Sequence, residues 1–195
     1  MEIGSDAHWI VRGKLLASRA PRDPRELASL ARAGVTHVLS LVESEDEERW
    51  SEAAGLRFVS SRMDEMGSPS SEAVRDAVSR LLLALRSSES ACVLVHCHAG
   101  VGRAGVVSAA YLGVMAGLTP EEAVAEVRQR RPGALWSQDK EVAVEDFLRA
   151  FSEGRVRLEG EHPCPKCERR VLHPGGPCFR CSGVRSLDVF LGVGS

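Results

Sequence analysis

The sequence of 195 residues has no uninterrupted apolar run long enough to cross a bilayer. It also lacks internal repeats and low-complexity segments, and its acidic start, Met-Glu-Ile-Gly-Ser-Asp, lacks the basic and apolar regions of a signal peptide. Charge of neither sign dominates, because 25 Lys and Arg face 27 Asp and Glu, a formal net charge of −2. These absences predict a cytoplasmic protein without a membrane segment. They do not favour a dedicated nucleic-acid binder, for which a strongly basic face is expected.

The length of the chain is enough for one good core and a small appendage. We expect a main domain over residues 1–152, a linker over 153–161, a small module over 162–185 and a tail over 186–195. Charge is divided unevenly along this chain. Residues 155–195 hold seven Lys and Arg against four Asp and Glu, a net +3, so the total of −2 leaves residues 1–154 at −5.

Strand-like and helical patterns alternate along the main domain. Strand-like runs at residues 35–41, 56–62 and 91–96 predict an α/β fold, with a largely parallel central sheet flanked by helices. Asp23 and Thr119 are each followed directly by a proline, and a glutamate stands two residues after that proline. Helices are therefore expected to begin at these two places and to run to about Gly34 and Arg131. Residues 70–86 have apolar side chains at helical spacing, and a final helix is expected over 139–151.

The most informative stretch is His96-Cys-His-Ala-Gly-Val-Gly-Arg103, between an apolar strand and an apolar helical run. A strand, a glycine-bearing loop and a helix start turn backbone N–H groups toward one point, where a phosphate can bind. Cys97 offers a nucleophile beneath the phosphorus atom, and Arg103 offers a bidentate clamp. The helix start, the amides and Arg103 all favour the Cys97 thiolate. The alternative is a buried cysteine beside ordinary loop glycines, but the combination predicts covalent phosphate chemistry.

The stretch HCHAGVGRAG resembles the His-Cys-x5-Arg signature of the cysteine-dependent protein phosphatases, and most of all the small dual-specificity type. The resemblance covers about the first 150 residues, with the segments 9–15, 34–41, the Asp64 loop, the signature and 130–133 in the family's order. It implies hydrolysis of phosphotyrosine, and of phosphoserine or phosphothreonine, in proteins, with no cofactor for catalysis. The phosphate-binding residues would be His98, Ala99, Gly100, Val101, Gly102 and Arg103.

The departing oxygen of a phosphate ester needs a proton, best supplied by a nearby carboxylic acid. Asp64 is the candidate, because it follows a strand-like run and lies in a loop similar to the family's general-acid loop. The same carboxylate would then take a proton from the hydrolytic water. Glu65 next door is a competing candidate, and the plain alternative is a solvated loop aspartate.

Three further residues have supporting roles by resemblance. His96 is expected to hydrogen-bond the loop backbone, and His98 lies on the lip of the cradle. Gln138 lies near the place where relatives have a glutamine that positions water, although its spacing from Arg131-Pro-Gly differs. Inositol-lipid specialists typically have lysines in the loop where this chain has His98 and Val101, so lipid substrates are disfavoured.

One residue departs from the family pattern. Relatives usually have Ser or Thr after the arginine, and its hydroxyl stabilises the thiolate that leaves the phospho-enzyme, whereas this chain has Ala104. Losing one donor to a charged sulfur should cost on the order of 1–3 kcal/mol. We therefore expect slow breakdown of phospho-Cys97. Two alternatives to a phosphatase stay open: a phosphoprotein-binding or slow-turnover trapping module, and a zinc-ribbon adaptor whose phosphatase domain serves as a scaffold.

Two other features are expected to be structural. The acidic run over residues 43–48 is interpreted as a solvated helix start, with repulsion of acidic substrates as the alternative. Cys92 is expected to be a packing residue. Five residues of strand separate it from Cys97 by about 16 Å, beyond the limit of about 7 Å between the Cα atoms of a disulfide.

The remaining four cysteines form two Cys-x2-Cys pairs at Cys164, Cys167, Cys178 and Cys181. This spacing predicts a structural Zn²⁺ in a zinc-ribbon-like module. Disulfides are disfavoured by the expected reducing compartment, and a redox pair by the presence of two matched pairs. His162 and His173 could substitute as ligands, but four cysteines already fill the shell.

The same segment is too short to build a core, so metal binding would supply its folding free energy. Zn²⁺ with four thiolates would lower the net charge of residues 155–195 from +3 to about +1. Phe179 is the only aromatic near its basic side chains, so nucleic-acid binding is not favoured. A structural or docking ribbon with a protein partner is expected instead.

Overall fold

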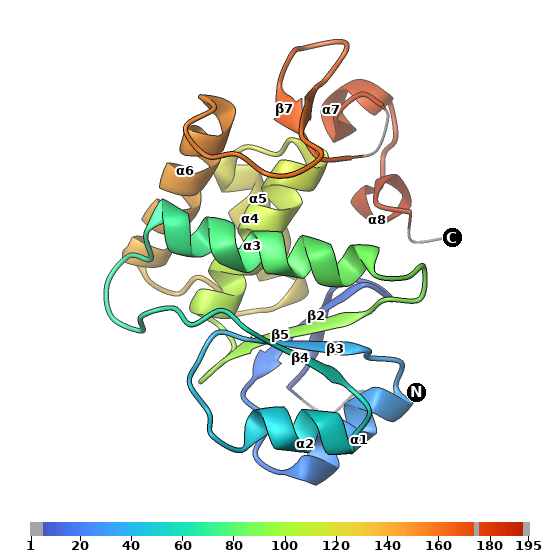
Figure 1. The fold of residues 1–195 in the computed structure, drawn as a ribbon. Helices are drawn as coiled ribbons and strands as arrows, with labels where there is room; N and C mark the ends of the chain where they lie inside the picture. Colours follow the sequence, from blue (N-terminus) through green and yellow to red (C-terminus); the bar gives the residue numbers. More distant parts are fainter. Residues whose placement is uncertain (1–5, 174–175, 193–195) are drawn as a thin grey trace.

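The computed structural model describes residues 6–173 and 176–192. Five strands form its main sheet in the order β1-β2-β5-β3-β4 (Figure 1). They are β1 (His8–Val11), β2 (Leu15–Arg19), β3 (His37–Ser40), β4 (Arg57–Ser60) and β5 (Val93–Cys97). β1 is antiparallel to β2, and every other neighbouring pair is parallel. The predicted α/β class with a largely parallel sheet is thereby confirmed, while the antiparallel hairpin of β1 and β2 was not predicted.

The parallel strands end together at one edge of the sheet. Cys97, the last residue of β5, is in register with Arg19 at the end of β2, and Ser40 at the end of β3 is in register with His96. Parallel α/β sheets gather ligand sites at the carboxyl ends of their strands. The cysteine of the signature therefore lies where such sites form.

Helices cover both faces of the sheet (Figure 1). One face has α1 (Pro24–Arg32) and α2 (Glu47–Ala53), and the other has α3 (Ser71–Arg86), α4 (Arg103–Ala116), α5 (Pro120–Arg130) and α6 (Gln138–Ser152). The predicted starts are confirmed by their caps. Asp23 accepts hydrogen bonds from the first turn of α1, and Thr119 forms a reciprocal capping box with Glu122 at the start of α5.

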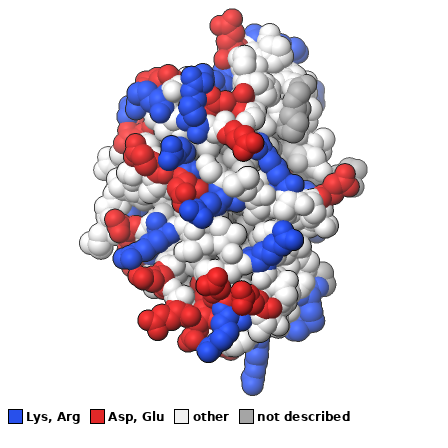
Figure 2. All heavy atoms as spheres, in the orientation of Figure 1, with Lys and Arg blue, Asp and Glu red and all other residues white. Residues whose placement is uncertain are grey.

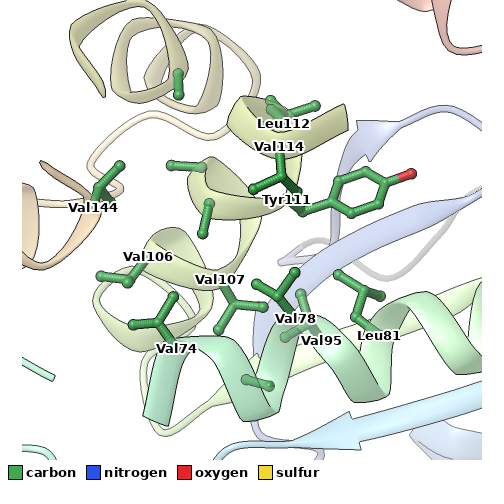
Figure 3. Close-up of a cluster of buried hydrophobic side chains, with 14 of the residues drawn as sticks. Val74, Val78, Leu81, Val95, Val106, Val107, Tyr111, Leu112, Val114 and Val144 are labelled. Atoms are coloured by element: carbon green, nitrogen blue, oxygen red, sulfur yellow. The ribbon is translucent and has the colours of Figure 1, made fainter. Parts of the chain in front are cut away.

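The core is built around α4, which has 13 buried residues among its 14. Figure 3 shows Val107 of this helix beside Val78 of α3 and Val95 of β5, and Val106 beside Val74 of α3. A second apolar cluster lies on the α1–α2 face and includes Cys92, which is 3% exposed. Burial raises the pKa of the Cys92 thiol to about 11, so this cysteine is a packing residue, as predicted.

The C-terminal segment packs against the far end of α4. It contains β6 (His162–Pro163), β7 (Arg170–Val171), α7 (Phe179–Ser182) and α8 (Leu187–Phe190). The Leu172 N–H donates to the Val114 carbonyl of α4 at 2.8 Å, and the side chains of Leu172, Leu187 and Phe190 join the main core. The segment therefore shares the core of the main body and adds only a small cluster of its own around Cys164, Val171 and Cys178.

The surface shown in Figure 2 has both charge signs interspersed, with acidic side chains gathered in its lower part near α2. Glu43, Glu45, Asp46 and Glu48 of the acidic run are exposed. Within residues 6–173 and 176–192, no helix combines the length and the apolar character needed to span a bilayer.

Candidate active site

The loop after Cys97 presents its backbone N–H groups on one side. Cys97 is 3% exposed at the end of β5, and α4 begins at Arg103. Four successive loop carbonyls accept hydrogen bonds from outside the loop: His98 O from the Ala20 N–H, Ala99 O and Gly100 O from Arg131, and Val101 O from the Leu135 N–H. Among the described residues, no backbone N–H of residues 98–102 donates to a protein acceptor. Because a carbonyl and the next N–H point in opposite directions, these N–H groups converge on the side that suits a phosphate.

Arg131 is the brace that holds the loop in this shape. It is 2% exposed, and its Nε donates to Gly100 O at 2.6 Å, while Nη2 donates to Ala99 O at 3.4 Å. Its Nη1 donates to Asp6 O at 2.8 Å and reaches Ala17 O of β2 at 3.5 Å. The sequence identifies Arg131 only as part of the segment 130–133 that resembles the family and as the end of a helix. The signal that could have identified it is an arginine directly before Pro-Gly, where the chain leaves a helix.

Gly100 is required by both space and backbone conformation. Its φ is +71°, and a Cβ there would lie 2.2 Å from the carbonyl carbon and oxygen of Ser18. A side chain would collide with β2 in a left-handed conformation that L-residues rarely adopt. The glycine thus lets the loop pack directly on the sheet edge.

Arg103 is held from the side opposite the loop. It is 6% exposed, and its Nη1 donates to Met63 O at 2.9 Å and to Leu41 O at 3.4 Å. These two carbonyls follow the ends of β4 and β3, so the guanidinium is fixed by the same sheet edge as Cys97. Its Nη2 lies 3.7 Å from the Glu65 carboxylate. This arrangement leaves one side of the guanidinium facing the pocket.

A pocket above this edge brings together several predicted residues. Its lining consists of Val42, Glu43, Arg62, Met63, Asp64, Glu65, His98 and Arg103. Asp64 and Glu65 are both exposed, and Glu65 also lies 3.9 Å from the His98 ring. The structure therefore places the acid candidate Asp64 beside Arg103 and His98, while the carboxylate in contact with Arg103 belongs to Glu65.

His96 contacts a carboxylate rather than the loop backbone. Its Nε2 lies 2.5 Å from Glu47 Oε1, and the Ser40 hydroxyl donates to the other Glu47 oxygen at 3.0 Å. The two atoms are in short contact without the alignment of a hydrogen bond. Glu47 is 2% exposed. The prediction of a solvated acidic run is therefore wrong for Glu47, because pairing with His96 and Ser40 compensates for its burial.

Gln138 and Lys140, both in the first turn of α6, lie differently with respect to the phosphate loop. Gln138 begins α6, is exposed, and is not among the residues that line the pocket. Lys140, 4% exposed, lies against the loop instead, since a Cβ on Gly102 would be 3.5 Å from its Cε. Sequence reasoning missed Lys140. The available signal was a single lysine in the otherwise uncharged or acidic start Ser-Gln-Asp-Lys-Glu.

The cysteines of the C-terminal segment form a cluster. The Sγ atoms of Cys164, Cys167, Cys178 and Cys181 all lie within 4.8 Å of one another. Tetrahedral zinc with Zn–S bonds near 2.3 Å needs sulfur atoms about 3.8 Å apart, and the Cys167–Cys178 separation is 3.6 Å. The donor set therefore fits a structural Zn²⁺.

The cysteines of the cluster differ in how readily they ionise without a metal: burial raises the pKa of Cys178, and hydrogen bonding to Cys178 raises that of Cys181 to about 12. Burial opposes ionisation of Cys164, but backbone N–H groups, first that of Cys178, outweigh it and lower its pKa to about 6. The two alternative ligands are engaged elsewhere. His162 Nε2 contacts the His173 carbonyl at 2.5 Å, and His173 contacts the Phe190 carbonyl and stacks on its ring at 4.2 Å.

Comparison with known proteins places most of the chain in one family. The family model PTP-SAK, described as "Swiss Army Knife protein, DSP-PTPase phosphatase domain", matches residues 5–153. Mouse protein tyrosine phosphatase type IVA 2 is 32% identical over 135 residues, which cover 69% of this chain and 79% of that protein. Mouse protein tyrosine phosphatase domain-containing protein 1 is 34% identical over 94 residues, 48% of this chain. The chain matches only 12% of that longer relative.

Solved structures show the same fold. The crystal structure of Tk-PTP in the active form has a TM-score of 0.65 and 31% identity, and the match covers 75% of this chain and 98% of that one. The crystal structure of PTPMT1 has a TM-score of 0.64 with 21% identity, covering 76% and 98%, which shows a shared fold alone. The C-terminal cysteine segment lies outside the family match.

Proposed function

The chain belongs to the PTP-SAK family of dual-specificity and tyrosine phosphatase domains, and from that premise we propose that it hydrolyses phosphotyrosine, and phosphoserine or phosphothreonine, in proteins. The reaction would proceed through a phosphocysteine on Cys97. The observation that carries this proposal is the orientation of the loop. Its carbonyls are bound from outside, so its N–H groups converge beside Cys97, while Arg103 is anchored on the opposite side.

In the first step, the Cys97 thiolate attacks phosphorus. A sulfur–phosphorus bond forms, the bond to the leaving oxygen breaks, and Asp64 donates a proton to that oxygen. The N–H groups of residues 98–102 and the Arg103 guanidinium bind the non-bridging phosphate oxygens, on which charge accumulates.

In the second step, water attacks the phosphorus of phospho-Cys97 and gives a proton to Asp64. The sulfur–phosphorus bond breaks, and inorganic phosphate and the thiolate are released. The departing sulfur gains negative charge next to Ala104, which has no hydroxyl to donate. This step is therefore the slower one.

Several supporting assignments complete the proposal. His98 lines the pocket that substrate would enter, and His96, next to Cys97 in the sequence, would support it as a buried residue paired with Glu47. Gln138 as the residue that positions water stays a prediction. We also propose residues 1–152 as the catalytic domain and 162–185 as a zinc-binding ribbon joined by 153–161 and followed by a tail over 186–195. The ribbon would dock a protein partner in the cytoplasm.

Ala104 favours a second candidate function, a module that traps phosphoproteins. If breakdown of phospho-Cys97 is very slow, the protein holds phosphate after one turnover. The two functions differ in stoichiometry, because a phosphatase releases many phosphates per chain and a trapping module releases about one leaving group per chain.

The test is multiple-turnover hydrolysis of an aryl phosphate and of phosphotyrosine and phosphoserine peptides. Cys97→Ser should abolish it, and Asp64→Asn should lower the rate by about 10²–10⁴-fold and flatten the basic limb of the pH–rate profile, where the wild type loses the proton of its general acid. Cys92→Ala is the matched control, since this second cysteine of the same strand region is buried away from the pocket, and it should retain activity. A stoichiometric burst without turnover supports the trapping module. No burst and no phosphate release would overturn both functions.

A further inference from the structure

A buried ammonium group lies beside the candidate site and takes no part in the reaction proposed above. Lys140 is in the first turn of α6, and the side chain is 5% exposed. Burial of a charged group is costly unless its hydrogen-bonding capacity is met. Lys140 Nζ meets it fully, donating to Glu65 O at 3.1 Å, Gly67 O at 2.5 Å and Asp139 Oδ2 at 2.8 Å. Three protons thus have three acceptors.

Two of these acceptors belong to the loop that holds Asp64. In the described part of the chain, Lys140 makes the only hydrogen bonds to the backbone of residues 64–68. The residues on either side are fixed by other means. Met63 O accepts from Arg103, and Ser70 caps α3. Between these points, Lys140 holds the backbone of the loop, and the Glu65 carboxylate adds longer contacts of 3.7 Å to Arg103 and 3.9 Å to His98.

Lys140 also touches the phosphate loop. A Cβ on Gly102 would lie 3.5 Å from Lys140 Cε, so the lysine stem packs beside the last residue before Arg103. The side chain therefore spans from the phosphate loop to the acid loop. The hydrogen bond that Lys140 donates to its partner Asp139 lowers the pKa of that carboxyl below its usual value.

We propose that Lys140 is a positioning residue that holds the 64–68 loop in the place from which Asp64 protonates the leaving oxygen. This inference rests on the proposed function and adds a residue to it. Lys140 is not among the residues that line the pocket. Its effect is transmitted through the carbonyls of Glu65 and Gly67, on either side of the exposed Met66.

A residue that acts through the general acid has a specific kinetic signature. A poor leaving group, such as the phenol of phosphotyrosine, needs protonation as it departs, whereas 2,4-dinitrophenol leaves readily as an anion. Loss of positioning should therefore slow the first substrate and spare the second. A general acid is worth about 10²–10⁴-fold, and partial loss of its placement should cost about 10–100-fold, within that range.

The experiment measures kcat/KM of Lys140→Met for a phosphotyrosine peptide and for 2,4-dinitrophenyl phosphate. We expect a fall of about 10–100-fold for the peptide and less than about threefold for the dinitrophenyl ester. Adding Lys140→Met to Asp64→Asn should cause little further loss, because both changes remove the same proton transfer. Inhibition by vanadate should stay unchanged.

Lys14→Met is the matched control. Lys14 also donates from Nζ to a backbone carbonyl, that of Glu89 at 2.5 Å, and it lies at the opposite end of β5, where its carbonyl accepts from the Val93 N–H. This variant should leave both rates unchanged. Thermal unfolding of each variant identifies any general loss of structure, which would slow both substrates equally.

Equal losses on both substrates, additivity with Asp64→Asn, or weakened vanadate inhibition would overturn the positioning role. The last result would show that the lysine charge acts on phosphate instead. The wild type and Asp64→Asn separate this failure from that of the proposed function. If the wild type hydrolyses neither substrate, the proposed function fails. If Asp64→Asn shows the leaving-group signature and Lys140→Met does not, only the role of Lys140 fails.

Discussion

Ala104 is fully buried in the first turn of α4, directly after Arg103. The next hydroxyl along the helix, that of Ser108, donates to the Ala104 carbonyl at 2.7 Å and is thereby occupied. No hydroxyl of the described chain donates a hydrogen bond to the Cys97 sulfur. The departing thiolate therefore lacks the donor that relatives supply from this position.

Ala104→Ser should restore that donor. If breakdown of phospho-Cys97 limits the rate, a gain of about 1–3 kcal/mol raises steady-state turnover by about 5–150-fold and shrinks the initial burst. Rapid-mixing kinetics with an aryl phosphate measure both. Ala109→Ser, at another fully buried alanine of α4, controls for burying a hydroxyl and should leave the burst unchanged. Identical kinetics in Ala104→Ser and the wild type would show that breakdown does not limit turnover.

Residues whose type and spacing indicate a reaction could be predicted from the sequence, whereas residues whose role depends on a partner far along the chain could not. Cys97 and Arg103 lie within one short stretch, so their relation was visible. In the sequence, Glu47 and Lys140 look like ordinary charged residues of the surface. Their burial depends on His96 and on carbonyls up to 75 residues away, and no local pattern reports such a pairing.

Among the structural elements, the phosphate loop depends on a brace outside itself. Arg131 follows α5, and its guanidinium binds two carbonyls of the loop and one of β2. Removing these donors leaves buried carbonyls unpaired, at about 1–3 kcal/mol each. The loop would then lose the shape that turns its N–H groups toward phosphate.

Arg131→Met should therefore weaken inhibition by inorganic phosphate by about tenfold or more, since 1.4 kcal/mol corresponds to one factor of ten. It should also lower the melting temperature. Arg130→Met is the control, because the neighbouring side chain donates to Ile10 O of β1 and to Asp188 instead. That variant should lose stability and keep its phosphate affinity. Equal weakening in both variants would point to a general loss of structure rather than a brace.

Elements with local signals were predictable, and those defined by pairing were less so. Asp23 and Thr119 mark helix starts through caps made by their own side chains. The hairpin of β1 and β2 was missed because β2 is short and Leu15–Ser18 are all buried, so it shows no alternation of apolar and polar residues. The expected strands at 35–41 and 56–62 shorten to β3 and β4, since pairing with neighbours sets their ends.

Across the whole molecule, α4 connects two sites. Its first residue, Arg103, belongs to the phosphate loop, and its last turn supports the cysteine segment through Val114 O and Gly117. A helix of 14 residues is about 21 Å long at 1.5 Å per residue, so the two sites are well separated. The cysteine segment contributes Leu172, Leu187 and Phe190 to the main core, which makes it part of the stability of the whole chain.

Removal of zinc by a strong chelator should therefore lower the stability of the main body as well as unfold the cysteine segment. Exposing these apolar side chains costs about 1.5–3 kcal/mol each at most, and we expect the melting temperature to fall by several degrees. Below that temperature, phosphate release per chain should stay within about twofold of the zinc-loaded protein, because the phosphate loop lies at the other end of α4.

Native mass spectrometry should count one zinc per chain before chelation, and added zinc should restore the melting temperature. Cys167→Ser should reproduce the effect of chelation, whereas Cys92→Ala should keep its zinc. Loss of phosphate release in step with loss of zinc, at temperatures where the body stays folded, would contradict this separation. It would mean that α4 transmits the state of the metal site to the phosphate loop.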